Sequence, residues 1–216
     1  MITTFAKPNA IFISWTSEGA TTIYRKTYED TEWKLVGNSY NQQYEDKTVV
    51  YGIAYQYKTV SYPDPHNPVT EISKYCWCID STNSYGVIYD LYGCELNRTA
   101  NSPLLMARIF DVATGELLNP SKVLNVTRSI SLLMCNDVVN PPRTLNLKNE
   151  EKLDLTKSLT SNLILSPEWS IDNRGYNFRM TLMDEVIQPI GTYLITVYLT
   201  TTDTTLVLRW ILESSL

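Results

Sequence analysis

The fold is decided most clearly by the stretch Tyr193-Leu194-Ile195-Thr196-Val197-Tyr198-Leu199 together with Leu206-Val207-Leu208-Arg209-Trp210-Ile211-Leu212. Both runs are rich in β-branched and aromatic residues, which fit a pleated and half-buried surface. The polar residues 200–205, around Asp203, separate the two runs. Because such runs joined by a short polar segment are typical of a β-hairpin, the C-terminal part of the chain is expected to be β-sheet.

Short strand signals of the same kind recur along the whole chain. In residues 10–16, Ile11, Ile13 and Trp15 share one face at a period of two, which predicts a strand. Further strands are expected at 22–26, 33–36, from 49, 55–61, 70–79, 85–89, 104–111, 123–135 and 176–182. Residues 62–68 hold three prolines and are expected to be a loop, because proline cannot serve a central ladder. Residues 147–160 support only a short helix or a loop.

The length of the chain, 216 residues, suits two β-sandwiches of roughly 100 residues each. Regular short strands separated by turns favour sandwiches or barrels over a βαβ fold. The turn-forming residues 80–84 are the expected boundary. We therefore expect an all-β protein with domains at 1–80 and 86–216 and a linker at 81–85.

The composition excludes several classes of function. A formal net charge of −5 and an isoelectric point near 5.0 provide no electrostatic footprint for nucleic acid. No apolar run approaches the ~20 residues that span a bilayer. Residues 1–8 lack the basic start and apolar core of a signal peptide, so the sequence predicts a protein that is not secreted. Cys76 and Cys78, two residues apart on an expected strand, are interpreted as small buried thiols.

No catalytic, metal-binding or cofactor-binding constellation emerges from the sequence. The single histidine, His66, lies in the proline-rich segment, and no phosphate-binding glycine loop is present. Acidic doublets such as Glu45-Asp46 are poor candidates for glycoside hydrolysis, because adjacent strand residues point to opposite faces. The chain is therefore expected not to be an enzyme.

The first half resembles a known family. The residues that carry this resemblance are Ile11-Phe12-Ile13-Ser14-Trp15, Tyr24-Arg25, Trp33, Tyr44-Glu45-Asp46 and Gly52-Ile53-Ala54-Tyr55-Gln56-Tyr57-Lys58-Thr59-Val60. In order and spacing they resemble a fibronectin type III domain over residues 3–80. The resemblance implies that Trp15 fills the core and that Tyr55 forms a tyrosine corner. The proline-rich segment 63–68 departs from the family pattern and leaves the last strand unplaced.

The second half also resembles known proteins. The residues that carry this resemblance are Ala113-Thr114-Gly115-Glu116, Tyr176-Asn177-Phe178, Pro189-Ile190-Gly191-Thr192-Tyr193 and Asp203. They resemble the immunoglobulin-like domains of phage tail and baseplate proteins. The combination of domains is similar in style to virion structural proteins of tailed bacteriophages, such as baseplate, fibre-adaptor or neck proteins. It implies a protein made in the host cytoplasm that assembles with other virion proteins and forms a homo-oligomer.

Aromatic residues in polar segments of the first half are the candidates for an interaction surface. Tyr28, Tyr40 and Tyr44 are expected to be exposed there. Tyrosine can anchor a protein interface or stack on a sugar ring. A carbohydrate-binding or host-adhesion module is therefore the alternative to a structural protein.

Overall fold

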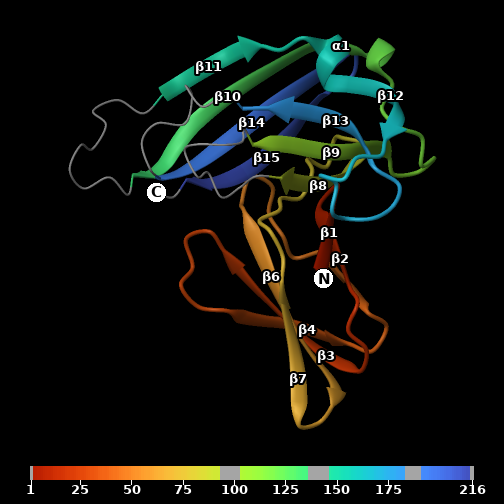
Figure 1. Ribbon diagram of the computed structural model, residues 1–216, viewed down its shortest axis with the longest axis vertical. Helices are drawn as coiled ribbons and strands as arrows, with labels where there is room; N and C mark the ends of the chain where they lie inside the picture. The colour runs from red at the N-terminus through yellow and green to blue at the C-terminus, as the bar shows by residue number, and fades with distance from the viewer. Residues whose placement is uncertain (1, 93–102, 136–145, 183–190, 215–216) are drawn as a thin grey trace. The chain divides into compact units, whose positions relative to one another are not determined.

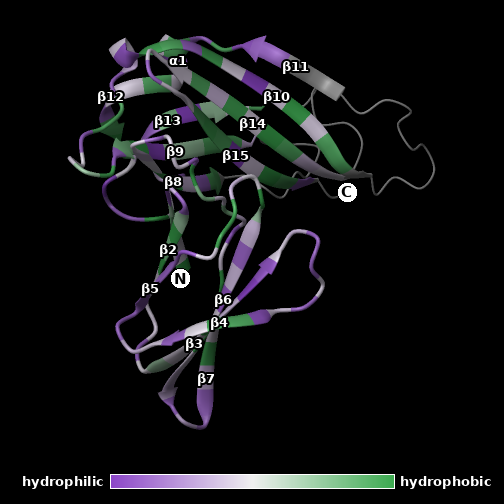
Figure 2. Ribbon diagram, turned by 180° about the vertical axis from the view of Figure 1, so that it is seen from behind, coloured by the Kyte–Doolittle hydropathy of each residue, from purple (hydrophilic) through white to green (hydrophobic). Residues whose placement is uncertain are grey.

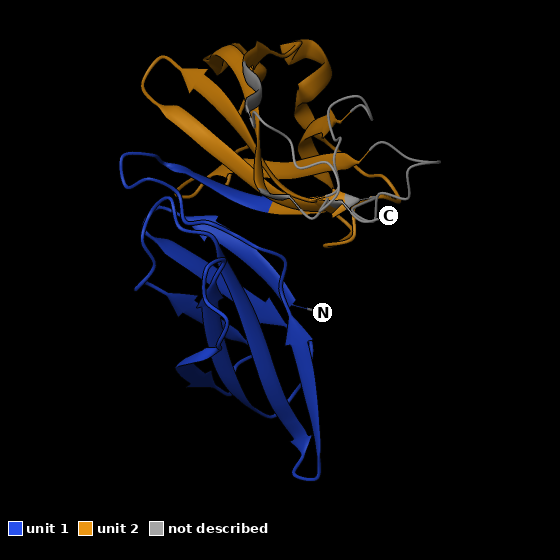
Figure 3. Cartoon of the chain, turned by 90° about the vertical axis from the view of Figure 1, so that its left-hand side faces the viewer, with its two compact units in different colours: residues 1–88 blue, residues 89–216 orange. Residues whose placement is uncertain are grey.

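The computed structural model describes residues 2–92, 103–135, 146–182 and 191–214 (Figure 1). The chain divides into two compact units, residues 1–88 and 89–216 (Figure 3). The division falls inside strand β8 (Tyr85–Tyr92). The linker predicted at residues 81–85 directly precedes this strand and overlaps it at Tyr85.

Unit 1 is built from antiparallel strands in two sheets. Its strands are β1 (Ile2–Lys7), β2 (Ala10–Trp15), β3 (Ala20–Thr27), β4 (Lys34–Ser39), β5 (Gln43–Asp46), β6 (Tyr55–Asp64) and β7 (Asn67–Ile72). One sheet has the order β1-β2-β5, and the other has the order β4-β3-β6-β7. Strand β1 also pairs with the start of β8 at Val87 and Ile88.

The core of unit 1 follows from the period of two along its strands. On β6 the side chains of Tyr55, Tyr57, Thr59 and Ser61 are buried, and the residues between them are not. On β2 the buried face includes Ile11, Ile13 and Trp15, as the sequence predicts. The core cluster consists of Ile2, Ile11, Ile13, Trp15, Ile23, Val49, Tyr55, Tyr57, Cys76 and Cys78. Its members come from both sheets, so unit 1 is a β-sandwich.

The proline-rich segment 62–68 is not the loop that the sequence predicts. Strand β6 continues to Asp64, strand β7 begins at Asn67, and these two residues pair. Prolines are tolerated here because β7 is an edge strand and because the register shifts between Ser61 and Asp64. The hairpin supplies the fourth strand of the sheet.

A second correction concerns the segment between β5 and β6. The strand predicted from Val49 is absent, since residues 47–54 carry no strand. Val49 is buried in the core, and Gly52 has a φ of 89°, which a strand does not contain. The strand of this region lies earlier, at β5, where Ile13 of β2 pairs with Tyr44.

Unit 2 is also built from two sheets. Its elements are β9 (Leu104–Asp111), the 3-10 helix η1 (Pro120–Lys122), β10 (Val123–Cys135), β11 (Asn146–Lys152), α1 (Leu155–Ser158), β12 (Leu159–Ile164), β13 (Tyr176–Thr181), β14 (Gly191–Thr201) and β15 (Thr205–Ser214). One sheet contains β12-β13-β9, and the other has the order β11-β10-β14-β15. Both hydrophobic and polar residues occur along β10 and β14 (Figure 2). Phe178 of β13 stacks on Trp210 of β15 at 6.0 Å between ring centroids, which joins the two sheets.

The hairpin predicted from residues 193–212 is β14–β15, paired from Gly191 with Ser214 to Thr200 with Thr205. The region 147–160 contains most of β11 and the four-residue helix α1. Pro141, Pro142 and the pair Pro189-Ile190 lie outside the described residues. The prediction of an all-β protein with sandwich architecture is confirmed.

Candidate interaction surface

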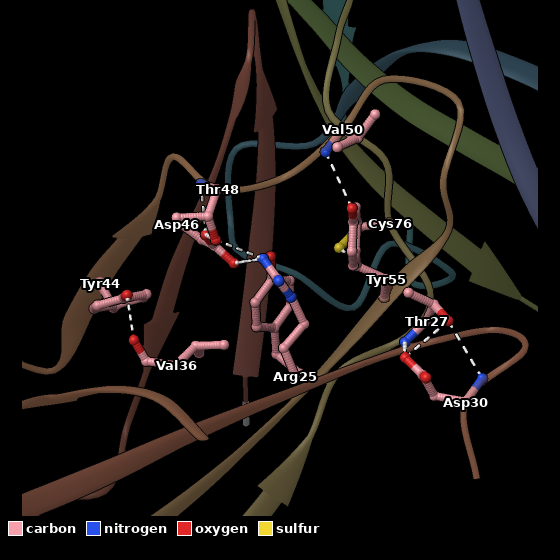
Figure 4. A network of polar contacts seen from close by, with 11 residues as sticks. Arg25, Thr27, Asp30, Val36, Tyr44, Asp46, Thr48, Val50, Tyr55 and Cys76 are labelled. Atoms are coloured by element: carbon pink, nitrogen blue, oxygen red, sulfur yellow. Dashed lines mark hydrogen bonds and ion pairs between the residues drawn. The ribbon is translucent and has the colours of Figure 1, made fainter. Parts of the chain in front are cut away.

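Trp15 and Tyr55 both lie in the core of unit 1. Trp15 donates a hydrogen bond from Nε1 to Oγ1 of Thr21 at 3.2 Å. The backbone N–H of Val50 donates to the hydroxyl oxygen of Tyr55 at 3.0 Å (Figure 4). Tyr55 is the first residue of β6, and its hydroxyl reaches back to the connection after β5. This is the geometry of a tyrosine corner.

A buried charge pair joins the two sheets beside this corner. Oδ2 of Asp46 on β5 accepts a hydrogen bond from Nη1 of Arg25 at 2.7 Å (Figure 4). The same oxygen accepts from the hydroxyl of Tyr57 at 2.9 Å. Oδ1 accepts from the backbone N–H and the hydroxyl of Thr48. Burial by itself would raise the pKa of Asp46, but hydrogen bonds from Thr48 and Tyr57 and the charge of Arg25 outweigh it and lower this pKa. The carboxylate is therefore a structural group with all its acceptor sites occupied.

The three tyrosines expected on one surface do not share one. Tyr28 follows the end of β3 and packs edge-on against Tyr75 at 5.6 Å. Tyr40, 79% exposed, follows the end of β4, which pairs with the beginning of β3. Because a strand rises about 3.3 Å per residue, the length of β3 separates them by roughly 20 Å.

Tyr44 lies on strand β5 and not in a polar loop. Its side chain packs against the core cluster, and its hydroxyl donates to the carbonyl oxygen of Val36 at 2.7 Å. The pKa of Tyr44 is raised, mainly by burial and to a lesser extent by the nearby charge of Asp46. The ring passes so close to Gly37 that a Cβ there would lie 2.5 Å from it. The prediction that loop tyrosines form an exposed platform is therefore wrong for Tyr44, because tertiary packing uses its ring.

A different group of side chains gathers on the outer face of the sheet β4-β3-β6-β7. Leu35 pairs with Tyr24, Tyr24 pairs with Lys58, and Lys58 pairs with Ile72. Paired residues on neighbouring strands point to the same side, so the four side chains form one row across the sheet. Their neighbours along β3 and β6, Ile23 and Tyr57, are fully buried, so the row points away from the core.

Two lysines lie over the rings of Tyr24, which belongs to this row, and of Trp33, which precedes β4. The ammonium of Lys58 lies 4.7 Å from the ring centroid of Tyr24 and 5.0 Å from that of Trp33. The ammonium of Lys26 lies 5.1 Å from the centroid of Trp33. Cations at this distance are attracted by the ring quadrupole. We call the residues Tyr24, Lys26, Trp33, Leu35, Lys58 and Ile72 the lysine–aromatic face.

Neither end of the row is covered. Leu35 is 61% exposed on one edge strand, and Ile72 is 53% exposed on the other. The sequence contains one signal for this face, because Tyr24 and Lys26, like Gln56 and Lys58, are two residues apart on predicted strands. Which of these side chains meet depends on the register between strands, and that register is not readable from single-strand patterns.

Metal ligands, membrane-spanning helices and cysteine thiols are the other candidate functional features in the described ranges. These ranges hold no cluster of three His, Cys, Asp or Glu side chains that could bind a metal ion. Within the same residues, no helix has the length and apolar character needed to cross a membrane. Cys76 and Cys78 are buried and are not joined in a disulfide. Burial raises the pKa of the Cys76 thiol to about 12.

No family model matches the sequence, and no curated protein matches it. Among solved structures, the chain is similar to a two-domain fibronectin type III segment of chicken tenascin, at 10% identity and a TM-score of 0.27, over 96% of this chain and 94% of that one. It is also similar to the FN1–FN3 domains of chicken CNTN1, at 12% identity and a TM-score of 0.29, over 97% of this chain and 63% of that one. These likenesses reveal nothing about function. By its two sheets, its buried Trp15 and its tyrosine corner, unit 1 has a fibronectin type III-like fold.

Proposed function

We propose that this chain is a non-enzymatic structural protein that works by protein–protein contacts, and that its setting is the tail, baseplate or neck of a tailed bacteriophage. The observation that carries the proposal of protein contacts is the lysine–aromatic face. The phage setting rests on the sequence resemblance, including the immunoglobulin-like character expected of the second half.

The composition of the face supports a protein partner. Aromatic residues are enriched in protein interfaces, and an apolar patch with a polar surround is typical of a binding site. Here Tyr24 lies in the row between the exposed side chains of Leu35 and Ile72, and Trp33 lies beside both lysines. The face lies on paired strands of a folded sheet, so little conformational entropy is lost when a partner binds.

The first test is the composition of the phage particle. Particles purified by density gradient from the phage that encodes this chain are expected to contain it in a fixed ratio to the tail proteins, as measured by quantitative mass spectrometry. A phage replication protein serves as the control that must be absent. Detection in the lysate together with absence from the particles would exclude the virion role.

The second test is self-association. We expect a symmetric homo-oligomer, because most soluble oligomers are symmetric and assemble from identical chains. Light scattering after size-exclusion chromatography at several protein concentrations measures its mass. A monomer at every concentration contradicts this part of the proposal and leaves the particle test unaffected.

The glycan-binding alternative receives less support from the geometry. A sugar ring stacks on an open aromatic face, but Lys26 and Lys58 lie over the ring of Trp33. Tyr40 is exposed, but it lies away from Tyr28. A glycan array with folded protein is expected to be negative. Binding that is lost in Tyr40→Ala would favour the alternative.

A further inference from the structure

We propose that the lysine–aromatic face binds a carboxylate-rich segment of a protein partner, with Asp or Glu side chains reaching Lys26 and Lys58 and apolar side chains lying on Leu35 and Ile72. The inference rests on the proposed function, because it names the chemistry of the partner in those protein contacts.

The ammonium groups of Lys26 and Lys58 lie close to the same aromatic ring. Both lie near the ring of Trp33, at 5.1 and 5.0 Å from its centroid. The two lysines are on adjacent strands, where Lys26 pairs with Gln56 and Tyr24 pairs with Lys58. Two cations are therefore held over one ring system, which limits their movement and presents them together.

The other sheet of unit 1 holds a comparable cluster of a lysine and aromatic rings. There Lys7 lies over the rings of Phe5 and Phe12, at 5.4 and 5.1 Å, and its ammonium forms a 2.9 Å ion pair with Glu45. Glu45 is the strand neighbour of Phe12. The chain thus completes one lysine–aromatic cluster with a carboxylate of its own.

The lysine–aromatic face also holds lysine ammonium groups over aromatic rings, but no carboxylate of the described residues pairs with them. Within the residues that the structure describes, neither Lys26 nor Lys58 forms an ion pair. Along the paired stretches that hold the row, the outward-pointing side chains are those of Ala20, Thr22, Tyr24, Lys26, Leu35, Asn38, Gln56, Lys58, Val60, Tyr62, Thr70 and Ile72. None of these is acidic, although Asp64 ends β6 beyond the register shift and Glu29, Asp30 and Glu32 lie in the connection that carries Trp33. Lys26 and Lys58 thus give the paired face two positive charges that an acidic partner complements.

The number of cations and the length of the row favour a peptide over a nucleic acid as the partner. A nucleic acid needs many phosphate contacts, and each contributes to a steep salt dependence. Two lysines on an acidic chain are too few for this mode of binding. The row crosses four strands, which at about 4.8 Å spacing corresponds to roughly 15–20 Å, the length of a short extended peptide. Because successive side chains of an extended peptide point to opposite faces, the matching peptide carries apolar residues at both ends of one face and acidic residues between them, as in Leu-Ser-Glu-Ser-Glu-Ser-Leu.

The experiment uses the full chain and defined probes. The amide spectrum of isotope-labelled protein is followed by NMR during titration with the peptide Leu-Ser-Glu-Ser-Glu-Ser-Leu, whose length of about seven residues spans the row. We expect shifts confined to β3, β4, β6 and β7. The same peptide with Gln in place of both Glu residues is the neutral probe and is expected to bind more weakly. Binding is also expected to weaken at about 1 M salt, where the Debye length is about 3 Å.

Charge-reversal variants test whether Lys26 and Lys58 contact the acidic peptide. Lys26→Glu combined with Lys58→Glu is expected to weaken binding roughly tenfold, since two attractive contacts become repulsive. The matched control is Lys122→Glu with Lys157→Glu, which makes the same change in net charge in unit 2 and should leave binding unaltered. Unchanged dispersion of the spectrum verifies folding in each variant.

Three outcomes overturn the inference. These are shifts mapped to other strands, equal weakening by the control pair, and stronger binding of an oligothymidine or a heparin fragment than of the acidic peptide. The presence of the chain in particles is measured separately. The virion role can therefore stand if the acidic peptide does not bind, and peptide binding can stand if the chain is absent from particles.

Discussion

Asp46→Asn tests the buried pair that joins the two sheets of unit 1. The substitution keeps the size of the side chain and one carbonyl oxygen, which can still accept from Thr48. It places an amide NH₂ where Nη1 of Arg25 donates at 2.7 Å, so two donors face each other. The hydroxyl of Tyr57 can turn to accept from the new amide, but the guanidinium has no such option.

The magnitude follows from these contacts. A hydrogen bond to a charged group contributes about 1.5–3 kcal/mol, and removal of one partner of a buried pair costs about 3–5 kcal/mol. The Arg25 side chain is 21% exposed, so water compensates part of the loss. We therefore expect a loss of about 3 kcal/mol in the stability of unit 1, which is roughly a hundredfold in its opening equilibrium.

The effect has a defined dependence on pH. The folded protein lowers the pKa of Asp46 below its ordinary value of 3.8. The stabilisation is therefore fully present above pH 3.8 and is lost as the pH falls through the folded pKa. Wild type and Asp46→Asn should accordingly differ at neutral pH and converge in strong acid.

Amide hydrogen exchange under native conditions is the assay, because it reports each unit separately. Amides of β3 and β6 should exchange roughly a hundredfold faster in the variant, and those of β14 should not change. Asp80→Asn is the matched control, since Asp80 accepts from the backbone and hydroxyl of Thr82 as Asp46 does from Thr48. A change in the exchange rates of β3 and β6 of less than about threefold would refute the reasoning, and so would an equal change in Asp80→Asn.

Three further predictions concern stability and reactivity. Tyr55→Phe removes the acceptor of the tyrosine corner and should lower the stability of unit 1 by about 1 kcal/mol in thermal unfolding; an unaltered transition would contradict the role of the hydroxyl. Gly175→Ala should destabilise unit 2 more than Gly115→Ala in urea titrations, because φ is positive at both but a Cβ at Gly175 would lie 2.1 Å from a carbonyl oxygen, whereas Gly115 has open space. Cys76, buried and with its pKa raised to about 12, should resist iodoacetamide in the folded protein and react after unfolding, as followed by mass spectrometry; rapid native labelling would argue against the buried position.

The sequence predicted the elements whose hydrophobic period is strong and local. Strands β9 and β10 begin and end where expected, and the closing hairpin β14–β15 forms around its polar turn. The segment 62–68 was mispredicted because the tolerance for proline depends on the place of a strand within the sheet. An edge position such as that of β7 is decided by which strands pair, and no local pattern reveals it.

The candidate site was less predictable than the fold. Tyr44 stands in a polar stretch of sequence, but its ring is used in packing over Gly37. Lys26 and Lys58 are unremarkable as single residues, yet strand pairing brings both to the ring of Trp33. A side chain's neighbours on a sheet come from other strands, so its environment depends on register.

The sequence by itself determined the all-β class and the buried faces of the strands, because alternation along one strand already separates inside from outside. The roles of Trp15 and Tyr55 were implied by the resemblance to fibronectin type III domains. Only the tertiary structure decided that Asp46 meets Arg25 across two sheets and that the lysine–aromatic face forms without a carboxylate of its own. The physical reason is that burial is encoded along a strand, whereas contacts between side chains are created by the pairing and stacking of strands distant in sequence.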